Sequence, residues 1–332
     1  RADIAHALGA APADVVLASG GTEACNLGVL GLAQAARAPR DAGLSPIERV
    51  VTTRIEHPAV VRAVERLSAQ IPGLERVWLD VPRGVPPSVT AFEQALSPAT
   101  LVALGWVNHE TGTVLPISEY AGACVRAGAR LVVDANQALG KLPIDVGALD
   151  ADALAVSAPK IGGPSGAGAL WVRRGVALEP RMLGGAQERG RRAGSADVIA
   201  AAGFGAAARA VSGEHAGAVT RLRDALEAAL VARGAVVNGA DGPRVGTVTN
   251  VSFRGRRSEL LVAALDLEGV CVSSGAACSS GLAAPSPVLR AMYPDEPWRA
   301  TSALRFSLGP GTTEAEVDEA LACLDRVLSR SA

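Results

Sequence analysis

The pattern of apolar and polar positions predicts strands that alternate with helices through most of the chain. Short apolar runs bounded by glycine, proline or polar residues predict strands, and segments with a helical apolar period predict amphipathic helices. The predicted strands are 14–18, 49–53, 75–79, 101–107, 130–133, 153–156 and 169–172, and the predicted helices are 1–8, 24–36, 58–67, 89–96, 117–127 and one that begins near 196. This alternation is typical of an α/β fold, so we expect a large domain with a mostly parallel sheet covered by helices.

The pattern changes near residue 212. Beyond it we expect helices at 215–233, 257–267 and 313–328, and strands at 235–237, 247–253, 269–273 and 303–308. This order predicts a separate and smaller α+β unit. We therefore divide the chain into a large domain, 1–212, and a C-terminal domain, 213–332.

The composition excludes several classes of protein. With 332 residues, of which 49% are hydrophobic, and a formal net charge of −1, the chain can build a substantial core and has no charge bias toward nucleic acid. Its five cysteines show no paired spacing, so we expect neither a disulfide framework nor a metal site. The sequence has no signal peptide and no apolar run long enough to span a bilayer, which predicts a cytoplasmic protein without membrane contact.

One lysine stands out against this composition. The chain has 32 Lys plus Arg, but only Lys141 and Lys160 are lysines. Lys160 follows a predicted strand and precedes a glycine-rich turn, in the stretch 155–171. An amine can lose its proton and form an imine, which a guanidinium cannot, so we interpret Lys160 as a Schiff-base lysine rather than a surface charge.

Polar residues follow several of the predicted strands. Ser19-Gly-Gly-Thr-Glu23 joins a strand to a helix, and free backbone N–H groups at such a turn favour a phosphate. Carboxyl ends of parallel strands meet at one edge of a sheet, where ligands bind. The residues at or just beyond predicted strand ends are Thr22, His57, Asn108, Asp134, Gln137 and Ser157.

Together these features suggest pyridoxal phosphate. Asp134 could keep the ring nitrogen of that cofactor protonated, and His57 could stack on the ring and transfer protons, although taken alone each has an ordinary reading as a turn or cap residue. Arg305, inside an otherwise apolar strand, is our candidate for a substrate carboxylate. Cys278 lies in a run of small residues, 272–281, where an accessible thiol could act as a nucleophile.

At this point the sequence resembles a known family, the cysteine desulfurases of the NifS/IscS type, within the class V aminotransferase group. The resemblance covers nearly the whole chain and rests on the motifs Ser19-Gly-Gly-Thr-Glu-Ala-Cys-Asn26, Glu56-His57, Val107-Asn-His-Glu-Thr-Gly112, Val133-Asp-Ala-Asn-Gln137, Gln187-Glu-Arg-Gly-Arg-Arg-Ala-Gly-Ser195, Ser273-Ser-Gly-Ala-Ala-Cys278 and Arg305-Phe-Ser-Leu-Gly309. It implies fold type I, a homodimer, and conversion of L-cysteine to L-alanine with the sulfur left on Cys278 as a persulfide. A sulfur-acceptor or iron–sulfur scaffold protein would then receive the sulfur.

The resemblance also implies roles for individual residues. Lys160 resembles the Schiff-base lysine, and Cys278 the persulfide carrier. His57 resembles the ring-stacking acid and base, Asp134 the pyridinium partner, and Gln137 the residue that bonds the phenolic oxygen. Gly21, Thr22 and Ser157 resemble cofactor-phosphate residues, Ser195 the one reaching in from the partner subunit, and Asn108 and Arg305 the pair that holds the substrate carboxylate.

Two departures from the family pattern leave alternatives open. Pro159 stands where the family has a histidine before the lysine. The chain begins at Arg1, within a helical pattern and without methionine, so we expect that an N-terminal segment that helps line the site is missing. The alternatives are another class V enzyme, such as a selenocysteine lyase or an aminotransferase, and a catalytically impaired sulfur-trafficking homologue.

Overall fold

The computed structural model describes residues 1–36, 46–211, 216–275 and 284–330, and it divides into two compact units. The first unit contains residues 1–79, 87–107 and 115–212, and the second contains 80–86, 108–114 and 213–332. Two short segments, 80–86 and 108–114, thus group with the second unit, whereas the sequence division had placed them in the large domain. The second segment carries Asn108, which is therefore described with the second unit.

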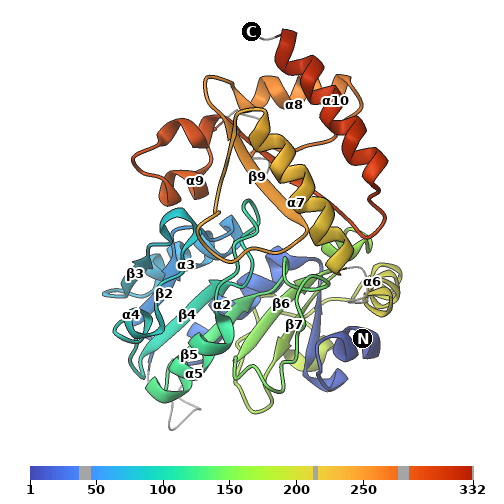
Figure 1. The fold of residues 1–332 in the computed structure, drawn as a ribbon. Helices are drawn as coiled ribbons and strands as arrows, with labels where there is room; N and C mark the ends of the chain where they lie inside the picture. Colours follow the sequence, from blue (N-terminus) through green and yellow to red (C-terminus); the bar gives the residue numbers. More distant parts are fainter. Residues whose placement is uncertain (37–45, 212–215, 276–283, 331–332) are drawn as a thin grey trace. The chain divides into compact units, whose positions relative to one another are not determined.

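A seven-stranded sheet forms the centre of the first unit (Figure 1). Every strand runs parallel to the others except β7, which is antiparallel to both of its neighbours. This confirms the predicted α/β fold with a mostly parallel sheet. In sheet order the strands are β1 (Val15–Ala18), β7 (Gly168–Val172), β6 (Ala153–Ser157), β5 (Arg130–Asp134), β4 (Thr100–Gly105), β2 (Arg49–Thr53) and β3 (Glu75–Leu79).

Helices α2 (Gly21–Ala35), α3 (Pro58–Gln70) and α5 (Ile117–Ala127) pack on the strands of this sheet. Helix α1 (Ala2–Ala7) packs against α6 (Val198–Ala210), and α4 (Val89–Glu93) packs against α5. Helix α2 approaches the sheet closely, since a Cβ at Gly28 would lie 2.9 Å from Cγ1 of Val132. The core between α2, α3 and the strands contains fully buried residues such as Leu32, Leu67 and Leu101. This packing fixes the helix N-termini at the carboxyl edge of the sheet.

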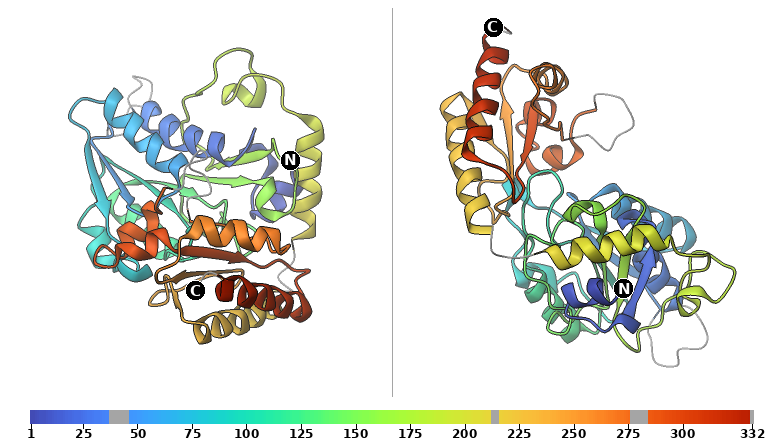
Figure 2. Two further views of the ribbon diagram at one scale, coloured as in Figure 1. Left: turned by 90° about the horizontal axis from the view of Figure 1, so that it is seen from above. Right: turned by 90° about the vertical axis from the view of Figure 1, so that its right-hand side faces the viewer.

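The second unit is built on a three-stranded antiparallel sheet. Its order is β10 (Ala303–Ser307), β9 (Val248–Phe253) and β8 (Ala235–Val237). Helices α7 (Ala216–Ala232), α8 (Ser258–Leu267) and α10 (Glu314–Arg330) pack against it, with α7 and α10 side by side (Figure 2), while the short helix α9 (Pro287–Met292) was not predicted. Leu230, Leu265 and Leu324 are fully buried in this second core.

The predicted strand 269–273 is wrong. Gly269 has a φ of 85°, and the amides of Gly269 and Val270 bond back to Asp266 and Leu265, so both residues belong to the end of α8. Ser273 pairs with Arg305 only through an isolated bridge, with N···O distances of 3.2 and 2.7 Å. The apolar run was misread because a helix C-cap and a strand can share the same short pattern.

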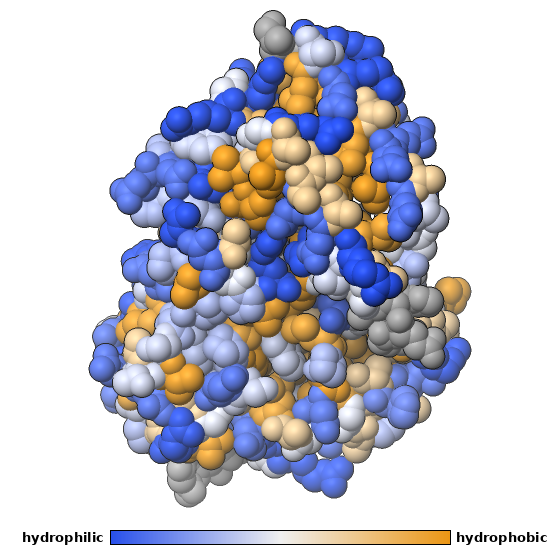
Figure 3. All heavy atoms as spheres, in the orientation of Figure 1, coloured by the Kyte–Doolittle hydropathy of each residue, from blue (hydrophilic) through white to orange (hydrophobic). Residues whose placement is uncertain are grey.

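Hydrophilic residues are spread over the visible faces of both units (Figure 3). Among the described residues, no helix is both long and apolar enough to cross a lipid bilayer.

Candidate active site

The turn before α2 is held against two other strand ends by glycine contacts. A Cβ at Gly21 would lie 2.3 Å from Oδ1 of Asn136, and a Cβ at Gly168 would lie 2.4 Å from the carbonyl carbon of Gly20. Only glycine permits approaches this close. The first turn of α2, with the exposed Thr22, therefore lies beside the end of β5 and the start of β7. Its backbone N–H groups suit an anion.

Asp134 ends β5, in the middle of the sheet edge. Its Oδ1 accepts hydrogen bonds from the backbone N of Asn136, at 3.0 Å, and from Nδ2 of Asn136, at 2.6 Å. Oδ1 of Asn136 is buried and has no hydrogen-bond partner among the described residues. Burial raises the pKa of the neighbouring Cys25 thiol, and the Asp134 charge raises it further. The carboxylate is thus fixed in orientation, and the thiol beside it stays neutral.

His57 caps α3 at the same edge. Its Nδ1 accepts from the backbone N of Ala59, at 3.1 Å, so a neutral ring carries its proton on Nε2. Burial lowers the pKa of His57; the Asp134 charge acts to raise it, and the Lys160 charge acts to lower it. His57 therefore lies within electrostatic range of both Asp134 and Lys160. The three residues that the sequence singled out for the cofactor ring thus gather in one place.

Lys160 is exposed, in the short 3-10 helix η3 (Ala158–Ile161) that follows β6. Ser157, the last residue of β6, is buried. Pro159 stands in the first turn of η3, where its missing N–H removes no helix hydrogen bond. The helix ends at Gly162, which has a φ of 79° and returns the chain toward β7. The local backbone therefore accommodates the proline while it presents the lysine.

Gln137 makes a hydrogen bond, and Ser195 lines a cavity, that the sequence did not predict. Oε1 of Gln137 accepts a hydrogen bond from Lys141. Ser195 is exposed and, together with Arg192, lines a cavity of about 240 Å³ in the first unit. Arg192 donates from Nε to Oε1 of Glu23, at 2.8 Å, and thereby ties the arginine-rich loop to the start of α2.

In the second unit, Asn108 and Arg305 lie near each other. Oδ1 of Asn108, which is buried, accepts from the backbone N of Glu110, at 2.9 Å. Nη1 of Arg305 donates to the carbonyl of His109, at 2.7 Å, and the buried Nε of Arg305 has no hydrogen-bond partner among the described residues. The predicted nucleophile, Cys278, lies outside the described residues.

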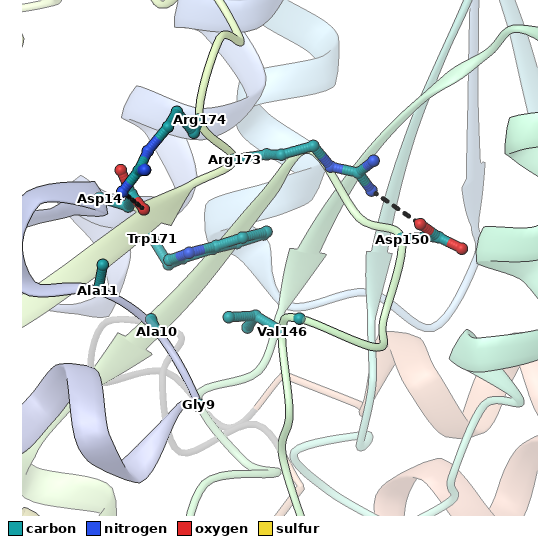
Figure 4. Close-up of a pocket in the computed structure, with 10 residues that line it drawn as sticks. Gly9, Ala10, Ala11, Asp14, Val146, Asp150, Trp171, Arg173 and Arg174 are labelled. Atoms are coloured by element: carbon teal, nitrogen blue, oxygen red, sulfur yellow. Dashed lines mark hydrogen bonds and ion pairs between the residues drawn. The ribbon is translucent and has the colours of Figure 1, made fainter.

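A second cavity, of about 320 Å³, lies at the opposite edge of the large sheet (Figure 4). Trp171 lines it and pairs with Val15, the first residue of β1. Its two arginines are already engaged, because Arg173 lies 3.6 Å from Asp150 and Arg174 lies 3.3 Å from Asp14. We therefore assign no ligand to it. Elsewhere in the described part of the chain, no cluster of three or more His, Cys, Asp or Glu could hold a metal ion.

The sequence reasoning missed two buried carboxyls. Glu56 and Glu110 are only 7% and 2% exposed, and burial raises the pKa of each to about 7. Both belong to the motifs quoted above, next to His57 and Asn108, but a glutamate in a short motif carries no signal of burial. Only the contacts made by their distant partners distinguish them from solvated residues.

Comparisons with known proteins show the family and the fold of the chain. The family model for class-V aminotransferases matches residues 1–320. The chain is 40% identical over 337 residues to an IscS-like cysteine desulfurase of Mycobacterium tuberculosis, covering 99% of this chain and 84% of that protein. A solved NifS-like protein superposes with a TM-score of 0.87 at 29% identity, covering 99% of this chain and 86% of that one.

A second solved structure, of SspA in complex with cysteine, has a TM-score of 0.76 at 28% identity and covers 94% of this chain and 86% of that one. The resemblance stated from the motifs is thereby confirmed. The chain belongs to the class-V aminotransferase family and, along nearly its whole length, is similar to cysteine desulfurases of the IscS and NifS type.

Proposed function

We propose that this protein is a pyridoxal-phosphate-dependent cysteine desulfurase, which converts L-cysteine to L-alanine and leaves the sulfur as a persulfide on Cys278. One observation carries the proposal: the charges of Asp134 and Lys160 both act on His57, at the carboxyl edge of the large sheet. This is where α/β sheets bind their ligands. The protein would work in the cytoplasm and pass the sulfur to an acceptor or an iron–sulfur scaffold protein.

The residues at this edge fit the cofactor. Lys160 would hold its aldehyde, and Asp134 would face its ring nitrogen. Gly21 and Thr22 at the start of α2 would hold its phosphate together with Ser157 and with Ser195, which would reach in from the partner subunit. Gln137 would use its amide N–H, because its oxygen is engaged by Lys141. The orphaned Oδ1 of Asn136, beside Gly21, is a further polar atom available to a ligand. When bound, the cofactor draws electrons from the substrate carbon.

The chain's own residues then have defined tasks. Arg305 and Asn108 would bind the substrate carboxylate, since a guanidinium can form paired hydrogen bonds with it. Lys160 would move the substrate α-proton, and His57, neutral because burial lowers its pKa, would exchange a proton through Nε2. The Cys278 thiolate would attack the substrate sulfur: an S–S bond forms, the C–S bond of cysteine breaks, and the carbon takes up protons to give alanine.

The test is to incubate the protein with pyridoxal phosphate and L-cysteine and to measure alanine and sulfide together. Equal amounts of both, in the presence of a reductant that releases the persulfide, are expected. Cys278→Ala should abolish sulfide while the cofactor absorbance remains. Full turnover of cysteine by Cys278→Ala would instead indicate an aminotransferase-like reaction, and no visible absorbance with added cofactor would indicate an impaired homologue.

We also propose a homodimer. Leu183, Val198 and Ile199 are 81, 77 and 86% exposed, and they lie on the segment around Ser195, the residue expected to reach into the partner subunit. Exposed apolar side chains grouped in this way are typical of an interface. Sedimentation should give twice the chain mass of 33.6 kDa, and Ile199→Glu should give a monomer. A monomeric wild type that is fully active would contradict this.

A further inference from the structure

Strands β2 and β4 separate before they reach the carboxyl edge. Their backbone pairing ends at Val51 and Val102, although β2 continues to Thr53 and β4 to Gly105. Within the remaining gap Oγ1 of Thr52 donates to the carbonyl of Ala103, at 2.8 Å, and Glu56 links the last residues of the two strands. Its Oε1 accepts from Oγ1 of Thr53, at 2.7 Å, and its Oε2 accepts from the backbone N of Gly105, at 2.7 Å.

This bridge connects the two residues that flank it in the site. Glu56 directly precedes His57, the cap of α3. Gly105 is paired with Asp134 in the sheet, and the next amide, of Trp106, donates to the carbonyl of Asp134, at 2.9 Å. One carboxyl therefore joins the backbone that carries His57 to the backbone that carries Asp134.

We propose that Glu56 is a positioning residue that sets the placement of the His57 ring relative to Asp134. It touches neither substrate nor cofactor in this role. It acts through the hydrogen bond from Thr53, which fixes the carboxyl to the end of β2, and the hydrogen bond from Gly105, which fixes it to the end of β4. The importance of this placement for the reaction rests on the proposed function.

Two further observations support it. A Cβ at Gly105 would lie 2.8 Å from Oε2 of Glu56, so the amide can approach the carboxyl only because residue 105 is glycine. The Thr53 hydroxyl is fully buried and the Gly105 amide is half-buried, and leaving a buried donor without an acceptor is unfavourable. Burial raises the pKa of Glu56 to about 7, and the Asp134 charge adds to this effect.

The experiment measures the His57 ring directly in cofactor-free protein. The chain has four histidines, and the spectrum of His57→Gln assigns the resonance. The charged groups that act on His57 are Asp134 and Lys160. In Glu56→Ala the ring should move away from its buried position, so its pKa should rise toward the ordinary histidine value and the Kd for pyridoxal phosphate should increase about tenfold.

Glu56→Gln is the rescue variant. Its amide oxygen can accept from Gly105 N and its NH₂ can donate to the Thr53 hydroxyl, so both hydrogen bonds survive without the charge. It should keep the wild-type pKa of His57 and the wild-type cofactor affinity. Glu65→Ala, which removes an exposed glutamate from the same helix α3, is the matched control and should change neither quantity.

If Glu56→Ala does not fold, two milder variants test the same bridge. Thr53→Val removes one hydrogen bond, and Gly105→Ala pushes the carboxyl away; each should shift the His57 pKa in the same direction. An unchanged His57 pKa in a folded Glu56→Ala, or in both milder variants, overturns the proposal. Because this pKa is measured without cofactor, its outcome is separate from the alanine and sulfide assay, which tests the proposed function.

Discussion

Glu56 in the first unit and Glu110 in the second are both buried, and burial raises the pKa of each to about 7, but their partners differ. Glu56 accepts from a backbone amide and a threonine, both at strand ends. Glu110 accepts from the hydroxyl of Ser286, at 2.5 Å, and the charge of Arg305 acts to lower its pKa. Burial is therefore the largest cause of both raised pKa values, while the partners set the role: one carboxyl joins strands, and the other lies beside the predicted substrate residues.

The largest losses of activity are expected from Lys160→Ala in the first unit and Cys278→Ala in the second unit, and the two variants should differ in whether the cofactor stays bound. Lys160→Ala, in the first unit, should lower turnover by about 10⁴-fold, the upper end of what a proton-transferring side chain contributes, and should also remove the bound cofactor's absorbance. Cys278→Ala should lower sulfide formation as severely but keep the absorbance. A loss of absorbance in Cys278→Ala would break the division between a cofactor-holding and a sulfur-accepting part.

The two glutamates should produce the same pH dependence of stability. Each glutamate has a pKa near 7 in the folded protein and an ordinary value of 4.5, so between these pH values the folded state binds more protons than the unfolded state. The contribution of each glutamate to the free energy of unfolding is therefore most favourable below pH 4.5 and is lost as the pH rises to 7. Each group should account for a loss of about 3 kcal/mol. Urea unfolding at pH 5 and pH 8 should show a smaller drop in Glu56→Gln and in Glu110→Gln than in the wild type. An equal drop in all three proteins would rule out both raised pKa values.

Arg305→Ala tests whether Arg305, in the second unit, binds the substrate carboxylate. Loss of a charged hydrogen bond costs about 1.5–3 kcal/mol, so the KM for cysteine should rise about tenfold to a hundredfold. The Kd for pyridoxal phosphate should not change, because Arg305 belongs to the second unit. Arg290→Ala, at an exposed position of the same unit, serves as the control. A cofactor affinity that fell with Arg305→Ala would contradict the assignment.

The smallest effect is expected where a carboxylate is exposed. Glu65 pairs with Arg62 at 2.8 Å, and the two side chains are 40 and 78% exposed. Solvent screens such pairs, so Arg62→Ala should change the free energy of unfolding by less than about 0.5 kcal/mol at any pH from 5 to 8. A change as large as that of the buried glutamates would show that burial does not explain the contrast.

Much of the fold could be predicted because it depends on local pattern. The strands 49–53 and 75–79 and the helix 117–127 have the bounds that the apolar period indicated. The strand 269–273 failed because its first residues close α8, which only the hydrogen bonds reveal. Helix α9, of six residues, was not predicted from the sequence.

The sequence by itself determined which strand ends carry His57, Asp134 and Lys160, because side-chain type and chain direction place them at one edge of a parallel sheet. Only the tertiary structure decided which glutamates are buried. Glu56 meets Gly105 across 49 residues of chain, and Glu110 meets Ser286 across 176. Desolvation and hydrogen bonding come from such distant neighbours, so the pKa of a carboxyl is a property of the folded chain and not of the motif that contains it.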